Sequence, residues 1–167
     1  CFVRPSEMVG AQWEEFDLDA AEWRIPAERM KMRHPHIVPL AAQVVKLLRE
    51  LHKITGHSPF LFPGERAPLS KHRSRDTLSK ALRSMGYQGQ ATPHGFRAMA
   101  STMLHEMGFT PDVIERQLAH KEPNKIRAAY NRAQYLTERK AMMQHWADFL
   151  GGLAIGGKVV AFKKSAA

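Results

Sequence analysis

The sequence predicts an α+β fold that is mostly helical and carries a small antiparallel sheet. Most segments repeat their apolar residues at helical spacing. Two short β-like runs flank a basic turn early in the chain, which is the pattern of a hairpin. The chain has 167 residues, of which 44% are hydrophobic, and this is enough for one domain with a core of its own.

The predicted sheet centres on a hairpin with a basic tip. The runs EWRIP (22–26) and HIVPL (36–40) enclose the segment AERMKMRHP, and both are short and rich in β-forming residues. Upstream, residues 5–16 are predicted as the end of a helix that leads into a short strand near Trp13–Phe16.

Two further helices are predicted on either side of a long loop. Apolar residues recur at helical spacing over residues 41–53 and again over 78–85, where Gly86 closes the second helix. Between them, the Gly and Pro residues of segment 56–68 predict a loop.

The most informative helix begins in the stretch TPHGFR. Thr92 is a natural N-cap and Pro93 suits the first helical position. Residues three apart share a helix face, so His94 and Arg97 project side by side from the first turn. Because this turn is the positive end of the helix dipole, the pair indicates an anion such as phosphate as the ligand.

The remaining helices follow directly along the chain. The TPHGFR helix is expected to end at Gly108, and a second helix begins at Thr110 and ends near Leu118. Further helices are predicted over residues 124–130 and 136–150.

The predicted domain covers residues 1–150, and residues 151–167 form a tail. The tail holds one β-like run, Val159–Phe162, with no partner strand within sequence reach. Pairing with the sheet edge of a neighbouring subunit and a disordered end are both compatible with this pattern. Since the chain opens inside an apolar segment without an initiator methionine, we expect it to be a piece of a longer protein.

Composition excludes several classes of protein. The single cysteine, Cys1, rules out an internal disulfide framework and fits a reducing compartment. No apolar run approaches membrane-spanning length and no signal-peptide pattern occurs, so we expect a cytoplasmic protein. The nine histidines do not sit at paired metal-ligand spacings, and no glycine-rich nucleotide motif is present. We therefore expect neither a metal nor a cofactor.

The positive charge is concentrated in two windows. The net charge is +9, and residues 65–97 and 116–140 each carry seven Lys or Arg against two Asp or Glu. The first window ends with the TPHGFR motif, and the second follows it in sequence. Such a concentration indicates a polyanion partner, and a solvated basic face is the alternative.

Six residues form a set that suits phosphodiester chemistry. Breaking a phosphodiester with side chains alone needs a nucleophile, positive charge on the non-bridging oxygens and an acid for the leaving oxygen. Tyrosine can act as nucleophile, arginines clamp phosphate, histidines donate or accept protons, and a lysine can protonate the leaving 5′ oxygen. The candidates are Arg4, Lys31, His94, Arg97, His120 and Tyr130.

Each candidate also has a simpler structural interpretation, and for His94 and Arg97 it is helix capping or surface pairing. Arg4 and Glu7 can form an i,i+3 ion pair, and His120 can cap a helix end. Lys31 can be a solvated lysine, and Tyr130 a packing residue with Tyr135 as its rival for the nucleophile. Spacing alone therefore leaves a DNA-binding module as an alternative to an enzyme.

Four segments in order resemble the C-terminal catalytic domain of the tyrosine recombinases, or phage integrases, and most closely those of bacterial prophages and genomic islands. RPSEMVGAQWEEFDL is similar to the first box of that family, MKMRHPHIVPL to its hairpin segment, TPHGFRAMASTML to its second box and VIERQLAHKEPNKIRAAYNR to its final box. The resemblance covers about residues 1–150. It implies the fold of the DNA breaking-rejoining enzymes, and it assigns catalytic roles to all six candidates, with Tyr130 as nucleophile.

This sequence departs from the family pattern in two respects. The step from His120 to Tyr130 is ten residues, where many members have nine, and this keeps Tyr135 as a rival. Members usually carry an N-terminal DNA-clamping domain, and no such domain is present in these residues.

The resemblance implies site-specific recombination, the integration or excision of a mobile element, through a 3′-phosphotyrosine intermediate. The implied partner is double-stranded DNA at specific attachment sites. The protein would be a monomer when free, a homo-tetramer in the synaptic complex, and associated with the nucleoid when bound. Backbone contacts to DNA are assigned to Lys71, Arg73, Arg75 and Lys125. A type IB topoisomerase, an excision-directing or telomere-resolving relative, and a non-catalytic module of the same fold remain as alternatives.

Overall fold

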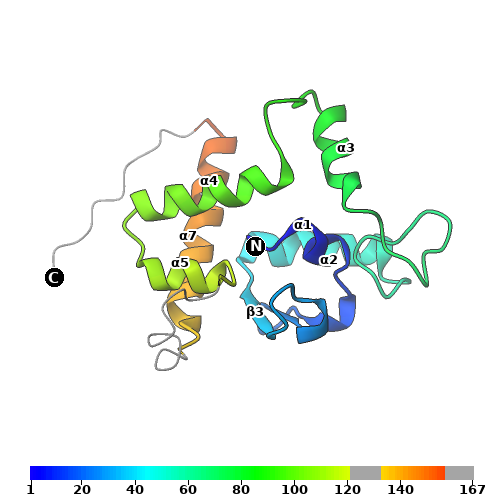
Figure 1. The fold of residues 1–167 in the computed structure, drawn as a ribbon, viewed down its shortest axis with the longest axis horizontal. Helices are drawn as coiled ribbons and strands as arrows, with labels where there is room; N and C mark the ends of the chain where they lie inside the picture. Colours follow the sequence, from blue (N-terminus) through cyan, green and yellow to red (C-terminus); the bar gives the residue numbers. More distant parts are fainter. Residues whose placement is uncertain (121–132, 157–167) are drawn as a thin grey trace.

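The computed structural model describes residues 1–120 and 133–156. Figure 1 shows three helices, α4 (Pro93–Glu106), α5 (Pro111–Gln117) and α7 (Leu136–Ala154), grouped on one side of the molecule. The short helix α1 (Pro5–Val9), the helix α2 (Ala42–Thr55) and the sheet lie on the other side, and α3 (Asp76–Ser84) stands apart from both groups. This arrangement confirms the predicted α+β class.

The sheet has three antiparallel strands in the order β1 (Phe16–Asp17), β2 (Glu22–Ile25) and β3 (His36–Pro39). In the β2–β3 pair, Trp23 lies opposite Val38 and Ile25 opposite His36, which confirms the predicted hairpin. Its connection contains a short 3₁₀ helix, η2 (Ala27–Arg29), and then Lys31 in an exposed turn.

The strand predicted near Trp13–Phe16 is wrong in its position. Residues Trp13–Glu15 form a 3₁₀ helix, η1, and only Phe16 belongs to a strand. The cause is the Glu15 carboxylate, which accepts hydrogen bonds from the backbone N–H of Gln12 at 3.2 Å and from Trp23 Nε1 at 2.9 Å. These bonds close a turn that an extended backbone could not make.

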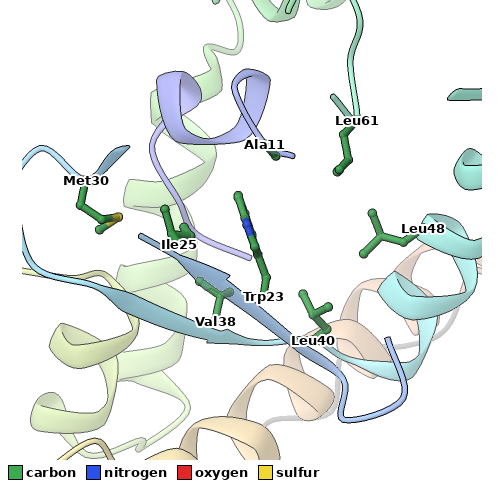
Figure 2. Packing of buried hydrophobic residues seen from close by; sticks show 8 residues of the cluster. All are labelled: Ala11, Trp23, Ile25, Met30, Val38, Leu40, Leu48 and Leu61. Carbon is green, nitrogen blue, oxygen red and sulfur yellow. The ribbon is translucent and has the colours of Figure 1, made fainter. Parts of the chain in front are cut away.

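The hydrophobic core consists of two clusters. The first joins the sheet to α2 and to the segment around Leu61, with Trp23, Ile25 and Val38 at its centre (Figure 2). The second joins α4, α5 and α7 through residues such as Leu104, Ile114 and Met142. Because α7 contacts α5, β3 and α2, it connects the two clusters.

The two ends of α4 lie where its capping residues predict, whereas α7 ends later than predicted. The side chain of Thr92 accepts a hydrogen bond from the backbone N–H of Gly95 at 2.9 Å, and Gly108, with φ of 82°, follows the last turn of α4. Helix α7 continues through Gly151 and Gly152 to Ala154, rather than ending at residue 150. Interior glycines cost a helix about 1 kcal/mol each without stopping it, and it is Gly156, with φ of 74°, that follows the last turn.

Candidate active site

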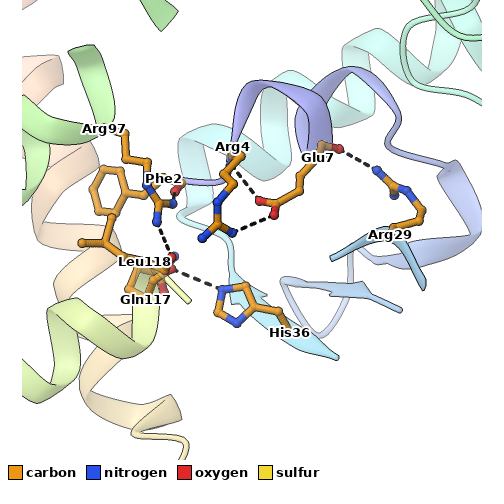
Figure 3. A network of polar contacts seen from close by, with 8 residues as sticks. All are labelled: Phe2, Arg4, Glu7, Arg29, His36, Arg97, Gln117 and Leu118. Atoms are coloured by element: carbon orange, nitrogen blue, oxygen red, sulfur yellow. Dashed lines mark hydrogen bonds and ion pairs between the residues drawn. The ribbon is translucent and has the colours of Figure 1, made fainter. Parts of the chain in front are cut away.

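Arg97 lies at the point where three segments of the chain meet. Its side chain projects from α4 and is only 7% exposed. One terminal nitrogen donates to the carbonyl of Phe2 and the other to the carbonyl of Leu118, which follows α5 (Figure 3). Since a guanidinium carries five N–H donors, these two bonds leave others for a ligand.

The electrostatic surroundings of Arg97 favour an anion. The pKa of Arg97 lies below its ordinary value, first because of burial and next because of the positive charge of Arg4. The carboxylates of Glu7 and Glu115 act in the opposite direction. Two guanidinium groups that repel one another in a partly buried place are stabilised by a shared negative charge.

Arg4 is held by its neighbour Glu7 at the start of α1. The backbone N–H of Arg4 donates to one carboxylate oxygen of Glu7 at 2.7 Å, and its guanidinium donates to the other at 2.9 Å. Glu7 is 3% exposed, so this ion pair is well shielded on the glutamate side. The predicted i,i+3 pair therefore exists, and it also fixes the direction of the Arg4 side chain toward Arg97 (Figure 3).

Arg29 connects the hairpin loop to α1. Its guanidinium donates to the backbone carbonyl of Glu7 at 2.6 Å and to the Glu15 carboxylate. Lys31 follows two residues later with an exposed side chain. The loop that carries Lys31 is thus tied to α1, whose N-cap residue is Arg4.

Several hydrogen bonds between buried polar groups meet at the C-terminal end of α5. Gln117, which is 1% exposed, accepts from Arg139 Nε at its side-chain oxygen at 2.8 Å and donates to the carbonyl of Cys1 at 3.1 Å. His36 Nε2 donates to the Gln117 backbone carbonyl at 3.2 Å. Burial, followed by the charge of Arg139, lowers the pKa of His36 to about 3, so its ring is neutral.

The two candidate histidines are both exposed. His94 lies in the first turn of α4, one turn before Arg97, as the spacing predicts. His120 follows α5 directly, and its Nδ1 lies 2.6 Å from a carboxylate oxygen of Glu115. The bond from Arg97 to Leu118 places the start of α4 beside the end of α5, from which these two histidines project.

The predicted nucleophile and one predicted DNA-contacting residue lie outside the described residues, whereas the rival tyrosine is described. Tyr130 and Lys125 lie outside the described residues, as does the predicted helix over 124–130. The rival Tyr135 is half-buried, has φ of 49° and packs against the second hydrophobic cluster.

Three predicted DNA-contacting residues lie on the connection between α2 and α3. Lys71 and Arg75 are exposed, whereas Arg73 pairs with Glu65 at 2.6 Å. The backbone there is ordered by two hydrogen bonds, from Gly64 to Lys71 and from Arg73 to Phe62. This connection lies at the opposite side of the molecule from α5 in Figure 1.

The described residues contain neither a candidate metal site nor a helix able to span a membrane. Within residues 1–120 and 133–156, no group of three or more His, Cys, Asp or Glu is placed to hold a metal ion. No helix in the same ranges has the length and apolar character needed to cross a membrane.

Sequence reasoning missed the residues that support the candidate side chains. Arg29 and Arg139 lie outside the four family boxes, and Gln117 lies inside the final box without an assigned role. The role of all three depends on contacts between distant segments. Glu115 precedes His120 by five residues, a spacing that becomes informative only once the end of α5 is known.

Comparison with known proteins shows the family. The Phage integrase family matches residues 1–136, and the chain belongs to this family. It is 43% identical over 158 residues to the prophage integrase IntA of Escherichia coli K12, covering 95% of this chain and 38% of that protein. It is 46% identical over 165 residues to the integrase of Enterobacteria phage P4, covering 89% of this chain and 37% of that protein. The chain thus spans well under half the length of these relatives.

Solved structures of recombinases share the fold. The XerA recombinase superimposes with a TM-score of 0.61 at 20% identity, covering 86% of this chain and 53% of that one. The integrase of mycobacterium phage Brujita superimposes with a TM-score of 0.58 at 20% identity, covering 84% of this chain and 46% of that one.

Proposed function

We propose that this chain is the catalytic part of a site-specific DNA recombinase that integrates or excises a mobile element. Membership of the Phage integrase family and the prophage relatives support this function. The observation that carries the proposal is the contact of Arg97 with both the Arg4 segment and the end of α5. One buried guanidinium thereby bonds backbone carbonyls that lie two residues before each of two other predicted catalytic residues, Arg4 and His120.

In the proposed reaction, the Tyr130 phenol gives up its proton to a basic group of the site, its oxygen attacks the scissile phosphorus, and the bond to the 5′ oxygen breaks. Lys31 gives a proton to the departing 5′ oxygen, leaving a 3′-phosphotyrosine and a free 5′-hydroxyl. Arg4 and Arg97, with His94 and His120, stabilise the negative charge on the non-bridging oxygens of the five-coordinate phosphorus.

The covalent intermediate explains how strands are rejoined without an energy source. A phosphotyrosine is a phosphodiester, so exchange with a 5′-hydroxyl forms one such bond for each that breaks. If that hydroxyl comes from a second duplex, the strand is transferred. Two rounds of exchange then recombine two duplexes through a four-way junction.

The proposed partner is double-stranded DNA at specific attachment sites. We further propose a monomer in the free state, a homo-tetramer in the synaptic complex, and a cytoplasmic protein that joins the nucleoid when bound. Residues 1–150 would form the catalytic domain, and residues 151–167 a tail whose Val159–Phe162 run contacts a neighbouring subunit.

A covalent trapping experiment tests the proposed function. The full protein is incubated with duplexes that are nicked in one strand and randomised in sequence, and DNA that remains attached to protein in SDS is recovered and sequenced. We expect a covalent adduct on a limited set of sequences. Paired copies of the selected sequence should then recombine, whereas a topoisomerase would only relax supercoiled DNA. Binding without any covalent adduct would indicate a non-catalytic module and contradict the proposal.

A further inference from the structure

The backbone after α5 brings two side chains together. Ala119 has φ of 49°, in the left-handed region, and its N–H bonds to the carbonyl of Arg116 at 3.2 Å. The N–H of His120 bonds to the carbonyl of Glu115 at 3.1 Å. These two bonds define a Schellman motif, in which the side chains at the positions of Glu115 and His120 normally meet in an apolar contact.

In this chain the apolar contact is replaced by a polar one. His120 Nδ1 lies 2.6 Å from Glu115 Oε2, and the two side chains are 44% and 47% exposed. An ionised carboxylate only accepts hydrogen bonds, so Nδ1 carries the hydrogen. The other ring nitrogen, Nε2, is then the one available to a ligand.

We propose that Glu115 is a positioning residue for His120, a role that rests on the proposed function. Its carboxylate fixes the imidazole with Nδ1 toward the protein and Nε2 toward the scissile phosphate, where Nε2 donates to a non-bridging oxygen when the ring is protonated and accepts a proton when the ring is neutral. A carboxylate in this position selects one tautomer and one ring orientation. The Schellman backbone sets the distance between the two residues, so the pair is oriented before DNA arrives.

Two arginines close to this pair, Arg116 and Arg97, form hydrogen bonds with groups other than the His120 ring. Arg116, also on α5, uses its Nε to bond Gln134 at 3.1 Å, and Arg97 bonds the carbonyl of Leu118. Among the contacts of residues 1–120 and 133–156, Glu115 is the acidic partner of His120. The negative charge of Glu115 also acts on Arg97, which places it at the edge of the same site.

The first test is independent of DNA cleavage. The ¹⁵N chemical shifts of the His120 ring in the full protein report which nitrogen carries the hydrogen when the ring is neutral. We expect hydrogen on Nδ1 in the wild-type protein and a return to Nε2 in Glu115→Ala. Hydrogen on Nε2 in the wild-type protein would overturn the proposal.

The second test is a double-mutant cycle on the rate of covalent cleavage of the selected nicked duplex. Glu115→Ala should slow cleavage about tenfold or more at saturating DNA, and Glu115→Gln, which keeps an acceptor oxygen, should recover part of the loss. In a protein that already carries His120→Ala, removing Glu115 should have a much smaller effect, set only by the charge that it exerts on Arg97. The exposed carboxylate of Glu106 on α4 provides the matched control, and Glu106→Ala should cleave at the wild-type rate.

The outcomes separate this inference from the proposed function. If His120→Ala cleaves normally, the assignment of His120 to the active site fails. If His120→Ala is impaired but Glu115→Ala is not, or if the two losses multiply in the double variant, the active site stands and the role of Glu115 is wrong.

Discussion

Arg139 Nε, on α7, donates a hydrogen bond to the side-chain oxygen of Gln117, on α5, at 2.8 Å. Both side chains are buried, and Arg139 also donates to the backbone carbonyls of Gln134 and Ile37. Burial, with a smaller effect from the charge of Arg116, lowers the pKa of Arg139 to about 10, so it stays charged at neutral pH. One guanidinium therefore fixes α5 against both α7 and β3.

Replacing Arg139 should destabilise the protein strongly. Arg139→Ala leaves the Gln117 side chain and two backbone carbonyls without their charged donor, and we expect a loss of about 3 kcal/mol in the free energy of unfolding. Chemical denaturation measures this loss. The adjacent Lys140, whose exposed ammonium lies 3.0 Å from Glu22, is the control, and Lys140→Ala should cost less than about 1 kcal/mol. Equal losses in the two variants would contradict the assignment of Arg139 to the core.

Arg97→Lys tests whether the site needs the planar shape of the guanidinium in addition to its positive charge. Lysine keeps the positive charge but lacks the planar fork that bonds Phe2 and Leu118 simultaneously. We expect covalent cleavage to fall by about 10²-fold or more and the free energy of unfolding to fall by about 1 to 3 kcal/mol. Arg24→Lys, where an exposed guanidinium on β2 pairs with the carboxylate of Glu22, should change neither quantity. Wild-type cleavage by Arg97→Lys would show that positive charge alone is sufficient.

The buried His36 should make stability depend on pH. Its pKa is about 3 in the folded protein and 6.5 ordinarily, so the unfolded chain binds more protons between these values. The free energy of unfolding should therefore fall as the pH falls from 6.5 toward 3, by at most about 1.4 kcal/mol per pH unit from this residue. Denaturation at a series of pH values measures the slope.

The variant His36→Gln tests whether His36 causes this pH dependence, and His57→Gln is the control. Glutamine at position 36 keeps an N–H donor for the Gln117 carbonyl but does not titrate, so its slope should be shallower than that of the wild-type protein. His57 is exposed, and His57→Gln should leave the slope unchanged. If His36→Gln retains the full wild-type slope, His36 is not the group responsible.

The salt dependence of DNA binding should reveal which basic residues contact phosphates. Each lost phosphate contact reduces the slope of log K against log salt by about 0.9. We expect this change for alanine variants of Lys71, Arg75 and Lys125, and a smaller one for Arg73, because Glu65 already pairs with it. Lys53, which binds both carboxylate oxygens of Glu50, is the control. An unchanged slope would assign the residue in question to a solvated face.

The elements whose ends are set by neighbouring residues, such as helix caps and turns, could be predicted from the sequence. The start of α4 follows from Thr92 and Pro93, and its end from Gly108, because caps depend on neighbouring residues only. The β2–β3 hairpin follows from two β-like runs around a basic turn. Four boxes in order were enough to identify the family, although each box alone was ambiguous.

The supporting contacts could not be predicted, because they join segments far apart in the chain. The bond from Arg97 to Phe2 spans 95 positions, and that from Arg139 to Ile37 spans 102. The sequence predicts a strand where Trp13–Glu15 form a 3₁₀ helix, because the contact of Glu15 with Trp23 that closes this turn is likewise tertiary. Ala119 adopts a left-handed backbone that its residue type does not favour, so the meeting of Glu115 and His120 carried no sequence signal.

Identification of the residue that becomes covalently attached to DNA tests the central claim most directly. The adduct formed on the nicked duplex is digested with protease, and mass spectrometry locates the nucleotide on the recovered peptide. We expect the nucleotide on Tyr130, no adduct with Tyr130→Phe although DNA binding persists, and a normal adduct with Tyr135→Phe. Attachment at Tyr135, or an adduct that survives Tyr130→Phe, would contradict the account.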